Sequence, residues 1–346
     1  MGLLENLPGN NNKRGWPWIE ETDPSIYSGE FIWPRISIVT PSFNQAEFIE
    51  ETIRSVLLQN YPNLEYIIID GGSTDTTVEI IKKYEKWIAY WKSEPDKGQS
   101  HAINKGIEKC KGEIFNWLNS DDYYSQNALF TIANNFLQKE VNIVAGCNNR
   151  FIEKNGQYHS TGNVKLELGY ETEQSLFFSG FRQSSTFFKL DHIKVLNGVR
   201  QDLNYVMDTE MFLRYILKFG QKNIKFLENI ITNYRLQKDS KTVSAQEMFT
   251  KEIDIIYSDL AKMAFDRKYN TVPNIGIPKY DLSSINENKV ISYYFALQAL
   301  RTPRKNIFKY IYFIQKCIAF YPQMNTRFFQ FLFQHILFYK KEVSDF

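Results

Sequence analysis

Residues 64–72 have the sequence LEYIIIDGG, in which a nearly continuous apolar run ends in an aspartate and two glycines. A strand that is apolar at successive positions is typical of parallel sheets, because helices cover both of its faces. The glycine pair ends the strand, since glycine favours turns over regular structure. Residues 36–40, ISIVT, form a shorter run of the β type. Both segments predict strands of an α/β domain.

Further strands are expected over residues 87–93, 113–118 and 141–146. Between the strands, apolar residues recur at helical spacing near 48–57, 78–88, 100–110 and 129–137. Strands that alternate with helices in this way predict an α/β fold with a mostly parallel sheet and helices on both faces. Ligands of such sheets bind at the carboxyl ends of the strands.

The pattern changes along the chain and suggests a division into three parts. Residues 1–34 are irregular and rich in Asn, Gly, Pro and Trp, which favours a strap lying on the domain. The α/β domain is expected over 35–245, as one half at 35–150 and a second at 151–245. The second half contains a hairpin at Asn155-Gly156 and a helix from about 208 to 219. Residues 246–346 are expected to form a C-terminal helical extension.

Composition excludes several classes of protein. A formal net charge of +2 gives no general argument for nucleic-acid binding. The three cysteines lie far apart and show no metal-binding spacing. The N-terminus lacks the apolar core of a secretory signal, and no apolar run reaches the roughly 20 residues that span a bilayer. A cytoplasmic location is therefore the default expectation.

Three polar clusters stand where strands end, at residues 40–44 (TPSFN), 70–75 (DGGSTD) and 119–122 (NSDD). They should converge at one edge of the sheet. The adjacent carboxylates of Asp121 and Asp122 repel each other, and a hard divalent cation is one reason to place them together. The alternative is a solvated turn in which Asp122 caps a helix. Likewise, Asp70 either caps a turn or accepts hydrogen bonds from a nucleotide.

Several segments resemble family-2 glycosyltransferases. They are PSFN at 41–44, TIRSVLLQ at 52–59, IDGGSTD at 69–75, DKGQSHAINKG at 96–106 and WLNSDD at 117–122. The resemblance extends over roughly residues 35–240. It implies the GT-A fold, a single α/β domain whose two halves bind donor and acceptor, and transfer with inversion at the anomeric carbon.

The resemblance also implies which side chains bind the nucleotide-sugar donor. They are Thr40, Pro41, Asn44, Asp70, Gly98, Gln99, Asn104, Asn119, Ser120 and Arg235. Asp121 matches the direct ligand of a Mn²⁺ or Mg²⁺ ion. The first position of that motif is Asn119 instead of an aspartate, and Asp122 is expected to replace part of the missing charge.

On the acceptor side, residues 204–214 (NYVMDTEMFLR) resemble the catalytic segment of the family, and Asp208 matches the general base. From the residues alone, the favoured interpretation of Asp208 is an N-cap, with Glu210 and Arg214 as a surface pair. Gln183 and Ser184 fall in a segment that resembles the acceptor-side loop. Gln237 stands where the family often has a histidine, so it is not assigned as a metal ligand.

These observations predict a glycosyltransferase that moves a hexosyl or N-acetylhexosaminyl group from a nucleotide diphosphate to a glycan or lipid-linked glycan. A UDP-sugar is the default donor of the family. The alternative is a degenerate sugar-binding or scaffolding domain. It is favoured by Asn119, Met207 and Gln237, which depart from the pattern of the family. A dinucleotide-dependent oxidoreductase should carry a G-x-G-x-x-G turn, but residues 41–44 are PSFN.

The last part of the chain mixes aromatic and basic residues over 301–346. A basic helix with aromatic anchors suits an anionic membrane surface, such as the inner face of the cell membrane. A helical subdomain packed on the rest of the chain, or a contact in a homodimer, is an equal alternative.

Overall fold

The computed structural model describes residues 2–9, 13–29, 32–154, 156–237, 245–269, 280–303 and 306–322. The chain divides into two compact units. The first contains residues 1–167, 180–215 and 221–249. The second contains residues 168–179, 216–220 and 250–346.

The strands of the first unit form a single nine-stranded sheet in the part of the chain that is described. They are β1 (Ile36–Ser42), β2 (Leu64–Asp70), β3 (Tyr90–Ser93), β4 (Ile114–Trp117), β5 (Tyr123–Tyr124), β6 (Ile143–Lys154), β7 (Gln157–Lys165), β8 (Thr186–Lys189) and β9 (Ile224–Arg235). Their order is β3-β2-β1-β4-β8-β6-β9-β5, and β7 pairs with β6. The predicted α/β class is confirmed.

Parallel pairing is concentrated in one part of the sheet. Strands β3, β2, β1 and β4 are parallel to one another. Beyond β4 the sheet is mixed, because β8 is antiparallel to both β4 and β6, β9 is parallel to β6, and β5 is antiparallel to β9. The expectation of a mostly parallel sheet therefore holds for the first half only, where every crossover contains a helix.

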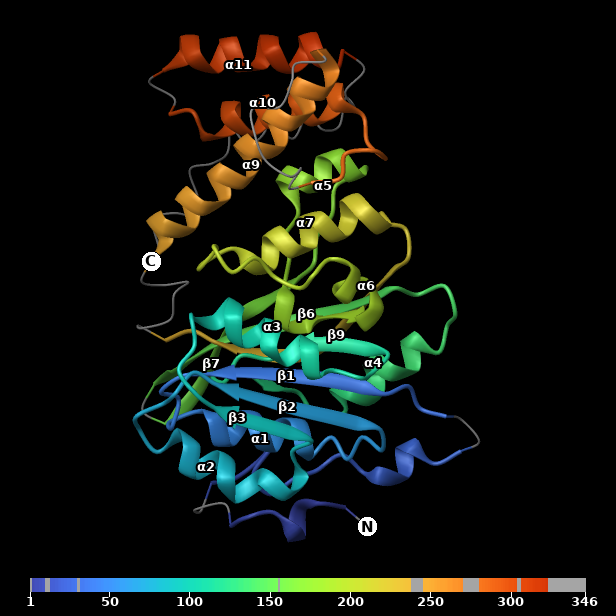
Figure 1. The fold of residues 1–346 in the computed structure, drawn as a ribbon, viewed down its shortest axis with the longest axis vertical. Helices are drawn as coiled ribbons and strands as arrows, with labels where there is room; N and C mark the ends of the chain where they lie inside the picture. The colour runs from blue at the N-terminus through green and yellow to red at the C-terminus, as the bar shows by residue number, and fades with distance from the viewer. Residues whose placement is uncertain are drawn as a thin grey trace. The chain divides into compact units, whose positions relative to one another are not determined.

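Helices cover both faces of the parallel strands. The helices are α1 (Ile49–Leu57), α2 (Thr77–Tyr84), α3 (Gln99–Lys109), α4 (Ala128–Phe136), α6 (Leu190–Val195) and α7 (Met207–Phe219). Figure 1 shows α1 and α2 on one side of β1–β3 and α3 on the other. Right-handed crossovers explain this, since the chain moves outward from β1 to β3 and then returns past β1 to β4.

The predicted N-terminal strap packs into the core of the first unit. Leu7, Tyr27 and Trp33 join the cluster between the sheet and α1, α2 and α4. The buried guanidinium of Arg54 on α1 ties the strap down by donating to the backbone carbonyls of Pro8, Pro17 and Trp18. These bonds satisfy a charged group that would be costly to bury alone.

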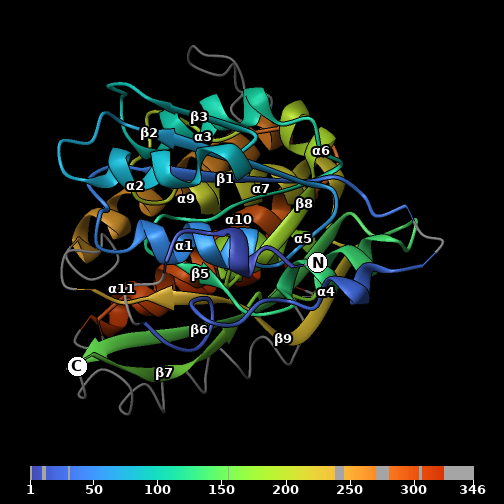
Figure 2. The same ribbon diagram turned by 90° about the horizontal axis from the view of Figure 1, so that it is seen from below.

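The hairpin predicted at Asn155-Gly156 is confirmed. Strands β6 and β7 are antiparallel, and their register ends with Lys154 opposite Gln157. Figure 2 shows these two long strands side by side. Because β6 also pairs with β8 and β9, it runs through the centre of the second half of the sheet.

The second unit is helical in its described part, with α5 (Thr172–Phe178), α10 (Glu287–Arg301), α11 (Ile307–Phe320) and most of α9 (Gln246–Tyr269). Ser292 on α10 donates to the carbonyl of Cys317 on α11 at 2.8 Å. No helix among the described residues is both long and apolar enough to cross a bilayer. Of the aromatic and basic segment 301–346, residues 304–305 and 323–346 lie outside the described residues.

Candidate functional site

A cavity of about 840 Å³ opens in the first unit, where the carboxyl ends of β1 and β4 meet the mixed half of the sheet. One wall carries Pro41, Ser42, Gln45, Gly98, Gln99, Asn119, Ser120 and Asp121. The other carries Asn148, Arg150, Arg182, Gln183, Ser184, Asp208 and Gln237. We call these the strand-end wall and the mixed-sheet wall. The volume lies within the range of about 300–1,000 Å³ typical of ligand sites.

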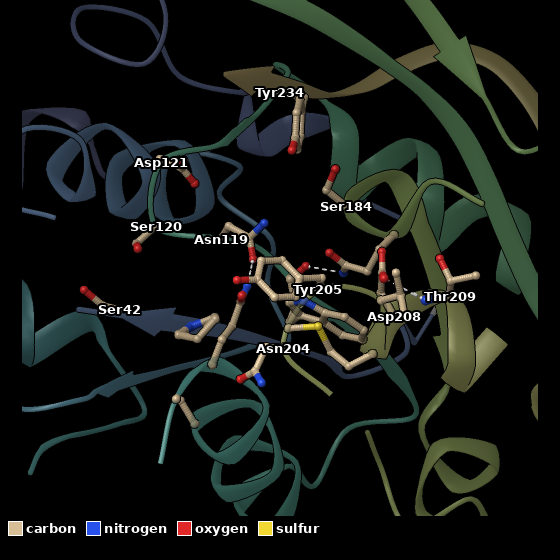
Figure 3. A pocket seen from close by; sticks show the side chains of 18 of the residues that line it. Ser42, Asn119, Ser120, Asp121, Ser184, Asn204, Tyr205, Asp208, Thr209 and Tyr234 are labelled. Carbon is tan, nitrogen blue, oxygen red and sulfur yellow. Dashed lines mark hydrogen bonds between the residues drawn. The ribbon is translucent and has the colours of Figure 1, made fainter. Parts of the chain in front are cut away.

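Nine of the predicted site residues line this cavity. They are Pro41, Gly98, Gln99, Asn119, Ser120, Asp121, Gln183, Ser184 and Asp208. Figure 3 shows Asp121 and Asp208 in separate parts of the cavity, with Asn119 and Tyr205 between them in this view. The two carboxylates therefore face one space from different elements, as the roles implied for them require.

Gly98 and Gln99 shape the strand-end wall. Gly98 precedes α3 with φ at 103°, in the region that favours glycine, and its N–H donates to Asp96 Oδ1 at 2.7 Å. Gln99 is the first residue of α3, and its side-chain amide donates to Asn119 Oδ1 at 2.9 Å. Asn119 thus contributes a neutral amide held by α3, at the position where the family motif has a carboxylate.

Asp121 and Asp122 are adjacent in sequence but occupy different environments. Asp121 lines the cavity, and its Oδ2 accepts a hydrogen bond from Gln237 Nε2 at 2.7 Å. Asp122 is 1% exposed and is not among the lining residues, and its Oδ1 accepts the backbone N–H of Arg235 at 2.9 Å. Burial raises the pKa of both carboxyls, and the charge of Asp121 raises that of Asp122 further. This placement favours a structural role for Asp122.

Arg235, predicted to bind the donor, is buried behind the strand-end wall. Its guanidinium forms ion pairs with Glu51 and Glu153, the latter at 2.8 Å, and its Nε donates to the carbonyl of Asp121 at 3.1 Å. The side chain also packs against Phe151. The charge of Arg235 is therefore compensated by carboxylates of the protein itself, and its contacts hold the Asp121–Asp122 segment in place.

Four further predicted donor residues do not line the cavity. Asp70 is buried and accepts the N–H groups of the turn that follows it, those of Gly72 and Ser73. Asn44 accepts from the N–H of Thr74. Asn104 bonds both backbone polar groups of Val199, and Thr40 bonds the hydroxyl of Tyr66. In this structure their side chains stabilise the turns and strands that form the site.

Asp208 lies in the first turn of α7, where its Oδ1 accepts the N–H of Thr209 at 2.7 Å. Burial raises the pKa of this carboxyl, and the charge of Arg182 opposes that rise. The alternative surface pair of Glu210 and Arg214 does form at 2.9 Å, but Glu210 is fully buried. The pair therefore anchors α7 within the core and leaves Asp208 at the cavity.

The mixed-sheet wall also contains residues that sequence reasoning missed. They include Asn148 of β6, whose side-chain nitrogen donates to Oγ of the predicted residue Ser184. The predicted residue Gln183 donates to the carbonyl of Trp117. Arg150 joins Asn148 from the same strand, β6. The only signal in the sequence was a polar run, NNR at 148–150, inside an otherwise apolar strand. Alternate side chains of β6 leave opposite faces of the sheet, so the pairing of β6 with its neighbouring strands decides which of them face the cavity.

Polar atoms that are buried yet unbonded gather in the cavity. They are Ser42 Oγ, Gln45 Oε1, Asn148 Oδ1, Arg150 Nε and Arg182 Nε, all from lining residues. Buried polar groups are normally bonded, so such a group of atoms indicates a site prepared for a polar ligand. Among the described residues, no three His, Cys, Asp or Glu side chains form a metal cluster.

Comparison with known proteins agrees with this geometry. Residues 37–200 match the model of the glycosyl transferase family 2. An uncharacterized glycosyltransferase of Rickettsia prowazekii (strain Madrid E) is 35% identical over 248 residues, which are 69% of this chain and 74% of that protein. The putative teichuronic acid biosynthesis glycosyltransferase TuaG of Bacillus subtilis (strain 168) is 39% identical over 101 residues, or 28% of this chain and 39% of that protein.

The fold has a counterpart among solved structures. The crystal structure of S. aureus TarS 1–349 in complex with UDP-GlcNAc aligns with a TM-score of 0.52 over 83% of this chain and 81% of that chain. Sequence identity is 14%, so this likeness concerns the fold. Three observations agree: the matches in sequence, the curled α/β sheet and the cavity at the strand ends. The chain therefore belongs to glycosyltransferase family 2 and is a glycosyltransferase.

Proposed function

We propose that this enzyme transfers a hexosyl or N-acetylhexosaminyl group from a UDP-sugar to a glycan or lipid-linked glycan, with inversion at the anomeric carbon. The observation that carries the proposal is the presence of two carboxylates, Asp121 and Asp208, on different elements facing one cavity. In-line displacement needs a group that stabilises the leaving diphosphate and a base for the attacking hydroxyl, and these two tasks belong on separate sides of the sugar.

The strand-end wall is suited to the donor. It combines the start of α3 at Gly98 and Gln99 with the amide of Asn119 and the carboxylate of Asp121. Backbone N–H groups at a helix start favour phosphate oxygens. Ser42 Oγ and Gln45 Oε1 supply unbonded polar atoms on the same wall. The name of the TarS complex, with bound UDP-GlcNAc, supports UDP as the nucleotide of the donor.

The charges around Asp121 fit a divalent cation. The guanidinium of Arg235 forms ion pairs with the carboxylates of Glu51 and Glu153, and its single charge also acts on the nearby carboxyls of Asp121 and Asp122. Burial penalises this excess of negative charge and raises the pKa of both aspartates. Asp121 is the residue that would hold Mn²⁺ or Mg²⁺ together with phosphate oxygens. The bound ion would supply Lewis-acid stabilisation of the leaving diphosphate.

Asp208 is proposed as the general base. Its raised pKa strengthens it as a proton acceptor, while the nearby charge of Arg182 favours the ionised form that a base requires. The N–H of Thr209 holds one carboxylate oxygen at 2.7 Å, which orients the group. A base in this position is typically worth about 10²–10⁴-fold in rate. The acceptor hydroxyl would transfer its proton to Asp208 as it attacks the sugar.

The acceptor class is proposed from relatives and from the chain itself. The name of TuaG supports a role in the synthesis of a surface polysaccharide. Three further statements stay predictions: that residues 301–346 contact a membrane surface, that the chain forms a homodimer, and that it is located in the cytoplasm. The match to the glycosyltransferase family and the two carboxylates that line one cavity argue against an inactive scaffold.

The test is thermal stabilisation of the full chain by UDP, GDP and dTDP, each with and without Mn²⁺. A ligand at a hundredfold excess over its dissociation constant adds about 2.7 kcal/mol of apparent stability. We expect a Mn²⁺-dependent shift with UDP that is lost in Asp121→Ala and kept in Asp191→Ala, a matched control on the exposed surface of α6. Folded protein that binds none of the three nucleotides would refute the proposal.

A further inference from the structure

Two arginines, Arg150 and Arg182, line the mixed-sheet wall. Arg150 belongs to β6, and Arg182 directly precedes the 3₁₀ turn Gln183–Ser185. The Nε of each is buried and has no hydrogen-bond partner. Arg182 uses one of its other nitrogens, Nη1, to donate to the carbonyl of Phe181. Within the described ranges, neither guanidinium forms an ion pair, so most of their donors are available to a ligand in the cavity.

The two positive charges are close enough to affect each other. Burial lowers the pKa of Arg182, and the charge of Arg150 lowers it further. The charges of Glu167 and Asp208 raise the pKa of Arg182 and so act in the opposite direction. Two like charges in a partly buried wall are unfavourable unless an anion joins them. A guanidinium fork binds phosphate and carboxylate through paired hydrogen bonds, which suits this arrangement.

Asn148 adds a third unbonded group beside the arginines. It lies two residues before Arg150 on β6, so both side chains leave the same face of the sheet. Its side-chain nitrogen donates to Ser184 Oγ at 3.0 Å, and its Oδ1 is buried without a partner. A carbonyl oxygen in this position is ready to accept from a hydroxyl group. The wall therefore offers donors for an oxyanion and an acceptor for a hydroxyl.

We propose that Arg150 and Arg182 bind an oxyanion, a phosphate or carboxylate group, of a negatively charged glycan acceptor, while Asn148 Oδ1 accepts from one of its hydroxyls. This inference rests on the proposed transferase function. We assign the oxyanion to the acceptor because both arginines line the same wall as Asp208, the proposed base, whereas Asp121 and the ion-paired Glu51 and Glu153 lie on the donor side. Specificity for an anionic acceptor follows from the two charges.

The experiment uses full-length protein saturated with UDP and Mg²⁺, so that the donor site is occupied. Inorganic phosphate, glucuronate and neutral glucose are titrated separately, and binding is followed by calorimetry and thermal shift. We expect at least one anion to bind and glucose to bind far more weakly. Arg150→Gln and Arg182→Gln should weaken the anion about tenfold or more, because each removes charge-assisted hydrogen bonds. Arg14→Gln, an exposed arginine outside the cavity, should bind the anion as the wild type does.

The outcomes separate this inference from the proposed function. Binding of phosphate alone or of glucuronate alone supports the subsite and identifies the anion. Loss of UDP affinity equal to the loss of anion affinity would assign the arginines to the donor diphosphate and overturn the subsite. Failure of the UDP-saturated wild type to bind either anion would overturn it too. Arginine-dependent phosphate binding in a protein that binds no nucleotide would instead refute the transferase proposal. Arg182→Lys keeps the positive charge and is the control for misfolding. Anion binding that this variant retains would show that the loss in Arg182→Gln comes from the missing charge.

Discussion

The two walls of the cavity are built differently from the same sheet. The strand-end wall takes short contiguous segments that follow β1 and β4, such as Asn119-Ser120-Asp121. The mixed-sheet wall takes the alternate residues Asn148 and Arg150 from the interior of β6, the turn at 182–184 before β8, and Asp208 from the start of α7. Parallel strands deliver consecutive residues to one edge, whereas a strand that runs along a site contributes alternate residues.

The walls also differ in the sign of their excess charge. Carboxylates outnumber the one guanidinium around Asp121, while Arg150 and Arg182 bring two guanidiniums to the opposite wall. This contrast suits a cation with a diphosphate on one side and an anionic acceptor on the other. A transferase that binds two anionic substrates gains from keeping their counter-charges apart, because each substrate is then drawn to its own wall.

The largest expected effect comes from the mixed-sheet wall. Asp208→Asn removes the proposed base but keeps an oxygen for the N–H of Thr209. We expect kcat for transfer to fall by about 10²–10⁴-fold. UDP affinity, measured by calorimetry with Mn²⁺, should stay within about twofold, because the donor contacts lie on the other wall. A large loss of UDP affinity would break the division between the walls.

Arg235 tests whether the strand-end wall is supported from behind or binds the donor directly. Arg235→Met leaves Glu51 without its buried partner, and such a loss costs about 3–5 kcal/mol of unfolding free energy. Urea denaturation measures this. Lys165→Met, which breaks the exposed pair with Glu228, should cost at most about 1 kcal/mol. A variant of unchanged stability that loses UDP binding would return Arg235 to the donor site.

Gln237 connects the two walls through its 2.7 Å hydrogen bond to Asp121 Oδ2. Gln237→Ala should weaken Mn²⁺-dependent UDP binding by about 10–100-fold, as losing the partner of a metal-binding group does. UDP binding without metal should change little. The control is Gln157→Ala, an exposed glutamine of β7. Equal losses with and without Mn²⁺ would mean that Gln237 acts on the nucleotide and not through Asp121.

The smallest effect is a shift of the pH profile. Burial raises the pKa of Asp208, and the base must be ionised, so kcat should fall as pH drops through a value above the ordinary range of aspartate. Arg182 favours the ionised form, and Arg182→Gln should therefore move this acid limb to higher pH. Arg14→Gln should leave it in place. The readout is kcat at saturating acceptor across pH. A limb that moves to lower pH would contradict the assigned base.

Motifs in the sequence located part of the lining of the strand-end wall. Residues 98–99 and 119–121 were identified by motif, and all of them line the cavity. Asp70, Asn44 and Arg235 do not line the cavity, and their side chains bond within the protein, so their contact with the donor stays a prediction. A motif shows that a residue type is needed in a turn, but the same residue can either contact a ligand or hold the turn. Only the hydrogen bonds of the folded chain distinguish the two.

By itself, the amino-acid sequence determined the α/β class, the hairpin at 155–156, the helix that carries Asp208 and the family to which the chain belongs. These properties depend on periodicity and on short contiguous motifs, which are local. Tertiary structure alone decided that Asp121 faces the cavity while Asp122 is buried, and that Asn148, Arg150 and Arg182 share a wall. The physical reason is that strand register and burial arise from contacts between residues far apart in the chain, and those contacts set which side chains remain unbonded for a ligand.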